Sequence, residues 1–192
     1  MQHVMLQRVS FRSGGADSDG VLHLPEYQAV GGAAVFGALD DTSDDTHAGL
    51  CDAFAREGIA ALRFAYRQPA TFESALAEVA GAIRLLKAHP LVPERLAVAG
   101  HAMGGAVAAV AAGRDSRIAA AVLVGAPGHI ADPRWRPIAE LSRTRARVLL
   151  AGGDAERYAA VLMQARVRNE RLDARDPELA AKVAAWLRSN IA

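Results

Sequence analysis

The chain of 192 residues is 52% hydrophobic and carries a net charge of +1 at pH 7. This length and composition predict one domain, residues 1–192, with a sizeable core, and the low charge excludes strongly basic nucleic-acid or membrane-surface proteins. A single cysteine, Cys51, excludes an internal disulfide. No apolar stretch is long enough to span a membrane, and residues 1–8 lack the apolar core of a signal peptide, so we expect a cytoplasmic protein.

Strands and helices alternate along most of the chain. A loose alternation predicts a strand at 4–11, and apolar runs predict strands at 21–24, 29–36, 59–65, 95–99, 118–124 and 147–151. Residues 167–172 are interpreted as a polar edge strand. Helical spacing predicts helices through 48–55 and at 72–89, 103–113, 133–142, 156–165 and 177–191. Residues 13–20 are typical of a turn, and Ser43 or Asp44 is suited to capping the first helix.

This order of elements predicts an α/β fold. The short, continuously apolar strands imply a mostly parallel central sheet with helices on both faces, and the first two strands form an antiparallel hairpin at one edge. Residues 127–147 are too few for a separate cap domain.

The stretch 96–112 is the centre of this arrangement, because it reads as a buried strand, a tight turn and an Ala-rich helix. Gly100, Gly104 and Gly105 lack the Cβ atoms that would clash where a strand reverses into a helix. The Gly-x-x-x-Gly frame is that of a nucleophile elbow, whose middle residue is normally Ser. Here the middle residue is Ala102.

With these motifs, the sequence resembles the α/β-hydrolase superfamily, and most of all its small, lidless bacterial members of the dienelactone-hydrolase and esterase type. The similarity covers almost the whole chain. It is most specific at Leu22–Pro25, Gly58–Phe64, Leu96–Gly105, Arg147–Gly153 and Glu178–Leu187. The resemblance implies a serine nucleophile, a histidine base, an acid that orients the base, and two backbone donors for an oxyanion.

Carried onto this chain, that catalytic set is incomplete. Ala102 stands at the nucleophile position and is inert. Asp154 and Glu156 both follow the strand at 147–151, and Glu156 is nearer the family's register for the acid. The base is expected before the last helix, but residues 171–177 contain no histidine, and Asp176 stands at that position. The resemblance therefore implies a degenerate triad.

The expected pocket residues surround the elbow. The Met103 amide is the first candidate oxyanion donor, and Ala38 or Leu39 is a candidate for the second. His101 is interpreted as a pocket-lining or structural residue. His129 is the best remaining candidate for a base, although a surface-loop histidine is the plainer interpretation. We expect the other histidines at the surface or in turns, namely His3, His23, His47 and His89.

No other motif indicates a cofactor or a metal ion. The acidic residues 40–45 and His47 match no metal-binding loop, and a solvated, helix-capping loop is the preferred interpretation. Cys51 lies on the apolar side of a predicted helix, where a buried, inert thiol is expected. Arg63 lies within a buried strand and therefore needs a partner.

Two functions are the leading hypotheses from the sequence. The first is an α/β-hydrolase-like protein that lacks the serine and the histidine and binds a small ligand or a protein partner without acyl transfer. The alternative is a serine hydrolase of the carboxylesterase or dienelactone-hydrolase type, seen here as a Ser-to-Ala variant at position 102. A third, non-hydrolytic chemistry of the kind carried out by lyases or cofactor-free oxygenases of this superfamily, also relies on a histidine base, so the missing histidine counts against it. A homodimer is the default expectation for a bacterial enzyme of this size.

Overall fold

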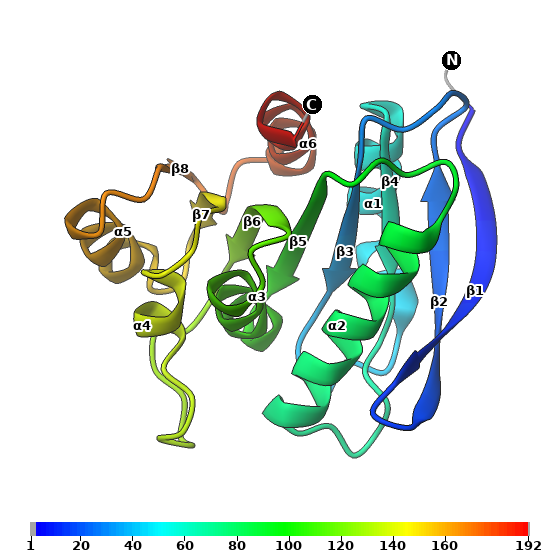
Figure 1. The fold of residues 1–192 in the computed structure, drawn as a ribbon. Helices are drawn as coiled ribbons and strands as arrows, with labels where there is room; N and C mark the ends of the chain where they lie inside the picture. Colours follow the sequence, from blue (N-terminus) through cyan, green and yellow to red (C-terminus); the bar gives the residue numbers. More distant parts are fainter. Residues whose placement is uncertain (1–2, 192) are drawn as a thin grey trace.

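The computed structural model describes residues 3–191, apart from the side chains of residues 44 and 46. Eight strands form one sheet in the order β1-β2-β4-β3-β5-β6-β7-β8 (Figure 1). The strands are β1 (Met5–Ser13), β2 (Ala16–Leu24), β3 (Gly31–Phe36), β4 (Ile59–Arg63), β5 (Leu96–His101), β6 (Ile118–Val124), β7 (Arg147–Ala151) and β8 (Asn169–Leu172). β1 pairs antiparallel with β2, β2 pairs antiparallel with β4, and the remaining pairs are parallel. The predicted α/β class, parallel sheet and edge hairpin are confirmed.

Helices cover both faces of the sheet. They are α1 (Ala48–Arg56), α2 (Phe72–Ala88), α3 (Met103–Arg114), α4 (Pro137–Leu141), α5 (Ala155–Gln164) and α6 (Leu179–Ile191), with a 3-10 turn, η1 (Asp44–His47), before α1. Apolar residues of α1 and α6 pack on one face of the sheet, and those of α2, α3, α4 and α5 pack on the other. Each helix can thus bury its apolar side against the sheet.

The predicted turn at 13–20 is wrong in extent, because β2 begins at Ala16 and only two residues make the turn. Gly14 and Gly15 have φ values of 54° and 83°. Two glycines in this conformation form the tight turn that matches the twist of a hairpin. The polar residues 17–19 look like a loop by composition, but they lie in a strand whose backbone pairs with β1.

The predicted helix at 133–142 is also too long. An α-helix is present only from Pro137 to Leu141. Before it, the Trp135 amide donates to the Asp132 carbonyl, and the Arg134 side chain pairs with the Asp132 carboxylate. These local bonds form a separate turn, and Pro137 then begins the helix, a position that suits its fixed φ.

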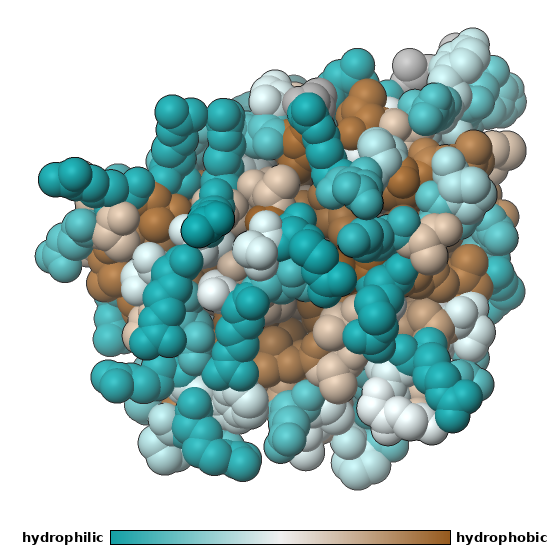
Figure 2. Space-filling model, viewed as in Figure 1, coloured by the Kyte–Doolittle hydropathy of each residue, from teal (hydrophilic) through white to brown (hydrophobic). Residues whose placement is uncertain are grey.

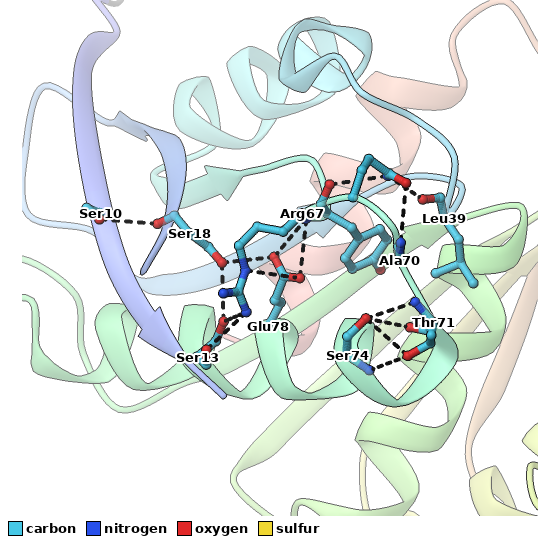
Figure 3. A network of polar contacts seen from close by, with 11 residues as sticks. Ser10, Ser13, Ser18, Leu39, Arg67, Ala70, Thr71, Ser74 and Glu78 are labelled. Atoms are coloured by element: carbon cyan, nitrogen blue, oxygen red, sulfur yellow. Dashed lines mark hydrogen bonds and ion pairs between the residues drawn. The ribbon is translucent and has the colours of Figure 1, made fainter. Parts of the chain in front are cut away.

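A buried carboxylate fastens the hairpin to α2 (Figure 3). Glu78, on α2, is 0% exposed and accepts a hydrogen bond from the Ser18 hydroxyl at 2.9 Å. The Arg67 amide also donates to Glu78, and the Arg67 guanidinium donates to the carbonyl and hydroxyl of Ser13 at 3.0 Å. The loop after β4 is therefore fixed between the hairpin and α2.

The same loop reaches the region beyond β3. The Gln68 side chain donates to the Leu39 carbonyl at 2.8 Å. Thr71 and Ser74 then form a reciprocal capping box at the start of α2 (Figure 3). These bonds hold the segments after β3 and β4 next to each other at the carboxyl edge of the sheet.

A shallow, largely apolar groove of about 340 Å³ lies between α2 and α3. Leu76, Val79 and Ile83 of α2 line it together with Ala111 of α3. Figure 2 shows this hydrophobic surface near the centre of the view, among long hydrophilic side chains. None of the helices within residues 3–191 has the length and apolar character that a membrane crossing requires.

Candidate functional site

The turn between β5 and α3 has an unusual backbone conformation. Ala102 has φ 52° and ψ −124°, a region that costs an L-residue about 1–3 kcal/mol. Its amide donates to the Val124 carbonyl at 2.8 Å, and its carbonyl accepts from the Gly105 amide at 2.9 Å. The sharp strand-to-helix turn of a nucleophile elbow is therefore present at the carboxyl end of β5.

The glycines of this turn are needed for backbone packing. A Cβ atom on Gly100 would lie 2.1 Å from the Gly104 carbonyl oxygen. A Cβ atom on Gly104 would lie 2.2 Å from the Gly37 carbonyl oxygen, in the loop after β3. Both distances are far below van der Waals contact with backbone atoms that cannot move aside. The Gly-x-x-x-Gly pattern is therefore required by the fold, whichever residue stands at position 102.

At position 102 the half-buried side chain is a methyl group, which has no lone pair to attack a carbonyl. The Met103 amide lies in the first turn of α3, before the hydrogen-bond ladder of the helix begins, so it suits a ligand oxygen. The adjacent loop is held through its carbonyls. That of Ala38 accepts from the Asp41 amide at 3.1 Å, and that of Leu39 accepts from Gln68. A second donor from Ala38 or Leu39 stays a prediction.

Both candidate acids follow β7, in different surroundings. Asp154 Oδ2 accepts a hydrogen bond from the Gly128 amide at 2.7 Å and lies 3.8 Å from Arg157 Nη1. Glu156 is exposed in the first turn of α5. Both acids line an open hollow of about 690 Å³ at the carboxyl ends of β7 and β8, together with Arg171. The fold fixes the carboxylate of Asp154 more firmly than that of Glu156.

The loop between β8 and α6 holds the expected base position. Asp176 accepts from the Glu178 amide at 2.8 Å and pairs with Lys182. The Lys182 ammonium, and then the Glu178 amide, lower the pKa of this carboxyl. Asp176 thus stabilises the start of α6. Ala174 instead lies against the end of β7, because a Cβ atom on Gly152 would be 2.8 Å from the Ala174 Cβ.

Sequence reasoning did not single out Ala174. Without a histidine in the loop, nothing in the sequence marks which residue is directed at the sheet. The Ala174 methyl group packs over Gly152, just after β7, and no sequence pattern marks this contact. Ala174 is therefore the better position for testing a restored base.

Two histidines meet beside the elbow. The rings of His47 and His101 are 6.0 Å apart in an edge-on arrangement. His47 Nε2 is buried and has no hydrogen-bond partner among the described residues. Burial lowers the pKa of His47, and the neighbouring His101 lowers it further. His47 was expected at the surface or in a turn, but it is partly buried next to the elbow, whereas His101 is exposed there.

His129 lies in a different hollow. It is exposed and lines a cavity of about 470 Å³ together with Trp135, Arg136 and Arg157. The residues that line this cavity do not include Ala102. His129 is thus an exposed loop residue, and its role as a base stays a prediction.

His23 was expected at the surface, and this prediction is wrong, because its side chain is 1% exposed. His23 Nδ1 lies 2.8 Å from Asp52 Oδ1, and His23 Nε2 accepts from Arg63 Nε at 2.8 Å. Arg63 Nη1 is also paired with Asp45 at 2.9 Å. The prediction that Arg63 needs a partner is confirmed. These contacts link β2, β4, η1 and α1 in a structural role.

The structure also bears on the interpretations of Cys51, of the helix-capping residues and of a metal site. Cys51 is fully buried, and burial raises the pKa of its thiol, in agreement with an inert role. Ser43 was one of two candidates for capping the first helix, but its hydroxyl accepts from the Asp45 amide and caps η1 instead, while the N-cap of α1 is His47, which makes no side-chain cap bond. Among residues 3–191 without the side chains of residues 44 and 46, no three His, Cys, Asp or Glu side chains are grouped so that they could hold a metal ion.

Solved structures share this fold across almost the whole chain. The esterase domain of a Rhodothermus marinus protein is 20% identical, with a TM-score of 0.73 over 98% of this chain and 100% of that one. An esterase from Pyrobaculum calidifontis is 18% identical, with a TM-score of 0.80 over 98% and 87%. A Klebsiella pneumoniae protein that carries the name of a dienelactone hydrolase is 16% identical, with a TM-score of 0.78 over 97% of each chain.

No protein-family model matches the sequence, and no curated protein matches it. At these identities the solved structures establish an α/β-hydrolase fold similar to that of esterases and dienelactone hydrolases. They show the fold alone, and the chemistry of this chain depends on its own residues.

Proposed function

We propose that this protein is an α/β-hydrolase-like protein that does not carry out acyl transfer and that uses the former active site to bind a small ligand or a protein partner. The observation that carries the proposal is the methyl group of Ala102 in an intact elbow. The absence of histidine from residues 171–177 supports it independently, because a base is needed as well as a nucleophile.

Features suited to binding remain at this edge of the sheet. The Met103 amide begins α3, and the polar hollow beyond β7 and β8 contains Asp154, Glu156 and Arg171. A ligand with one carbonyl or carboxylate oxygen and a further polar group matches these donors and acceptors. Such binding needs neither a nucleophile nor a base.

The first experiment measures hydrolysis of p-nitrophenyl acetate and p-nitrophenyl butyrate by the purified protein. We expect the rate of buffer alone. Turnover well above that rate, which disappears in Glu156→Gln or His129→Gln, would overturn the proposal.

The second experiment restores the missing groups. In an Ala102→Ser background, Ala174→His is compared with Asp176→His. We expect higher esterase activity with Ala174→His than with Asp176→His, because Ala174 lies against the end of β7 and Asp176 caps α6. Activity with Ala102→Ser alone would show that a working base is already present, and the proposal would then fail.

The alternative is a serine hydrolase represented here by a Ser-to-Ala variant. The retained strain at Ala102 favours it, because a strained elbow is useful to a nucleophile. The codon for position 102 in the source gene decides between the two. A serine codon would establish the alternative, and an alanine codon would exclude it.

A further inference from the structure

Five arginines line one hollow of about 570 Å³, far from the elbow. They are Arg143, Arg145, Arg147, Arg166 and Arg168, and all five are exposed. Arg147 begins β7 and Arg168 immediately precedes β8. The hollow thus lies at the amino ends of parallel strands, whereas Ala102 follows the carboxyl end of β5.

The first three arginines are held on one side of their segment. Exposed and buried residues alternate from 143 to 147, with Thr144 and Ala146 buried between the arginines. The Thr144 hydroxyl donates to the Ala112 carbonyl at 2.7 Å and accepts from the Ala146 amide at 3.0 Å. This anchor fixes the backbone and leaves the three guanidinium groups outside.

Arg166 reaches the hollow through an unfavourable backbone conformation. Its φ is 59°, at the residue that follows the cap of α5. The Arg166 amide donates to the Met163 carbonyl and the Val167 amide donates to the Leu162 carbonyl, which is the hydrogen-bond pattern of a Schellman motif. Glycine is the usual residue there, because it adopts this φ without strain.

Few anionic groups balance this charge. Within the described residues, Arg145, Arg166 and Arg168 form no ion pair. Arg147 donates to the Asn190 side chain, which is neutral. Arg143 lies 3.8 Å from Glu140. That carboxylate also pairs with a second arginine on α3 at 2.7 Å. Helix ends favour nearby cations, which accounts for one arginine after α4 and one after α5. It does not account for five.

We propose that this hollow binds a small polyanion, and specifically an organic phosphate that carries two or more phosphoryl groups. Guanidinium groups bind phosphate oxygens in pairs of parallel hydrogen bonds, so several arginines around one concavity match several phosphoryl groups. The volume is in the range of small-molecule sites. A net charge of +1 and the gathering of these five arginines around one small hollow favour this ligand over a nucleic acid or an anionic membrane.

Inorganic pyrophosphate is the probe, measured by titration calorimetry with the full chain at 150 mM NaCl. We expect saturable binding of one molecule per chain. Arg166→Gln with Arg168→Gln should weaken it at least tenfold. Arg134→Gln with Arg175→Gln, which removes the same charge outside the hollow, should leave it unchanged. Circular dichroism confirms that both double variants are folded.

Arg166→Gly separates a structural role from a binding role. Glycine removes the strain at φ 59°, so the melting temperature should rise by about 2–4 °C while pyrophosphate binding weakens. A purely structural arginine would not link a gain in stability to a loss of binding.

Three outcomes would overturn the proposal. They are the absence of saturable pyrophosphate binding, an equal loss of binding in the two double variants, and unchanged binding in Arg166→Gly. Duplex DNA or phosphatidylglycerol vesicles are tested in parallel. If either binds through Arg166 and Arg168 while pyrophosphate does not, the site belongs to a macromolecule or a lipid surface and the proposal is wrong.

Discussion

The elbow and the anchor of the N-terminal hairpin depend on different parts of the polypeptide. At the elbow, the backbones of Gly100, Gly104 and Gly37 approach so closely that a Cβ atom does not fit. At the anchor, the side chains of Glu78 and Arg67 make the contacts. The elbow can therefore keep its shape while the side chain at position 102 changes, whereas the anchor cannot tolerate the loss of its side chains.

Gly100→Ala tests the close backbone packing at the elbow and has the largest expected effect. The added Cβ atom would lie 2.1 Å from the Gly104 carbonyl oxygen, so β5 and α3 would have to separate. We expect a loss of more than about 4 kcal/mol in the free energy of unfolding, or failure to fold, which is the range of severe core disruption. Urea denaturation followed by circular dichroism measures it.

Gly49→Ala is the matched control. Gly49 is exposed in α1, and a Cβ atom there would meet nothing within 4 Å. The same change should therefore stabilise the protein by roughly 0.5–1 kcal/mol, because alanine favours the helix. Similar stabilities for Gly100→Ala and Gly49→Ala would contradict the close backbone approach.

Glu78→Ala tests the side-chain contacts that anchor the hairpin. The change removes a carboxylate that is 0% exposed and leaves the Ser18 hydroxyl and the Arg67 amide without their acceptor. We expect a loss of about 2–4 kcal/mol, the range for buried hydrogen bonds and ion pairs that lose one partner. Glu73→Ala, on the exposed side of α2, should change stability by less than about 1 kcal/mol. Equal effects would show that the anchor is unimportant.

Ala102→Gly tests whether the elbow still holds strain without a nucleophile. Glycine adopts φ 52° readily, so we expect a gain of about 1 kcal/mol in the free energy of unfolding. Ala108→Gly, inside α3, should instead lower stability by roughly 1 kcal/mol or more. If Ala102→Gly is also destabilising, the alanine methyl group makes contacts that outweigh the strain.

The fold was predictable from the sequence because its signals are local. The apolar runs of the strands and the glycines at 100, 104 and 105 reflect close packing that the structure confirms. Side-chain partners that are distant in sequence were not predictable. His23 is buried because Arg63, 40 residues away, donates to it. The register of the loop around Ala174 depends on a contact with Gly152 that leaves no pattern in the sequence.

The smallest expected effect concerns His47, beside the elbow. Its pKa in the folded protein is lowered, chiefly by burial, so below pH 6.5 the unfolded chain binds a proton more readily than the folded one. The contribution of His47 to stability is complete above pH 6.5. It declines as the pH falls from there through the lowered pKa. The free energy of unfolding is measured by urea denaturation between pH 7.5 and pH 5.0. In His47→Gln, the share of its decline that comes from His47 should be absent.

His129→Gln is the control for that measurement, because the side chain of His129 is exposed in a separate hollow. The free energy of unfolding of His129→Gln should fall with pH as steeply as that of the unchanged protein. The buried His23 is present in all three proteins, so its contribution cancels and the difference between them isolates His47. If His47→Gln and His129→Gln decline equally, the imidazole of His47 is solvated. The packing of η1 against the elbow would then be looser than its contact with Gly37 indicates.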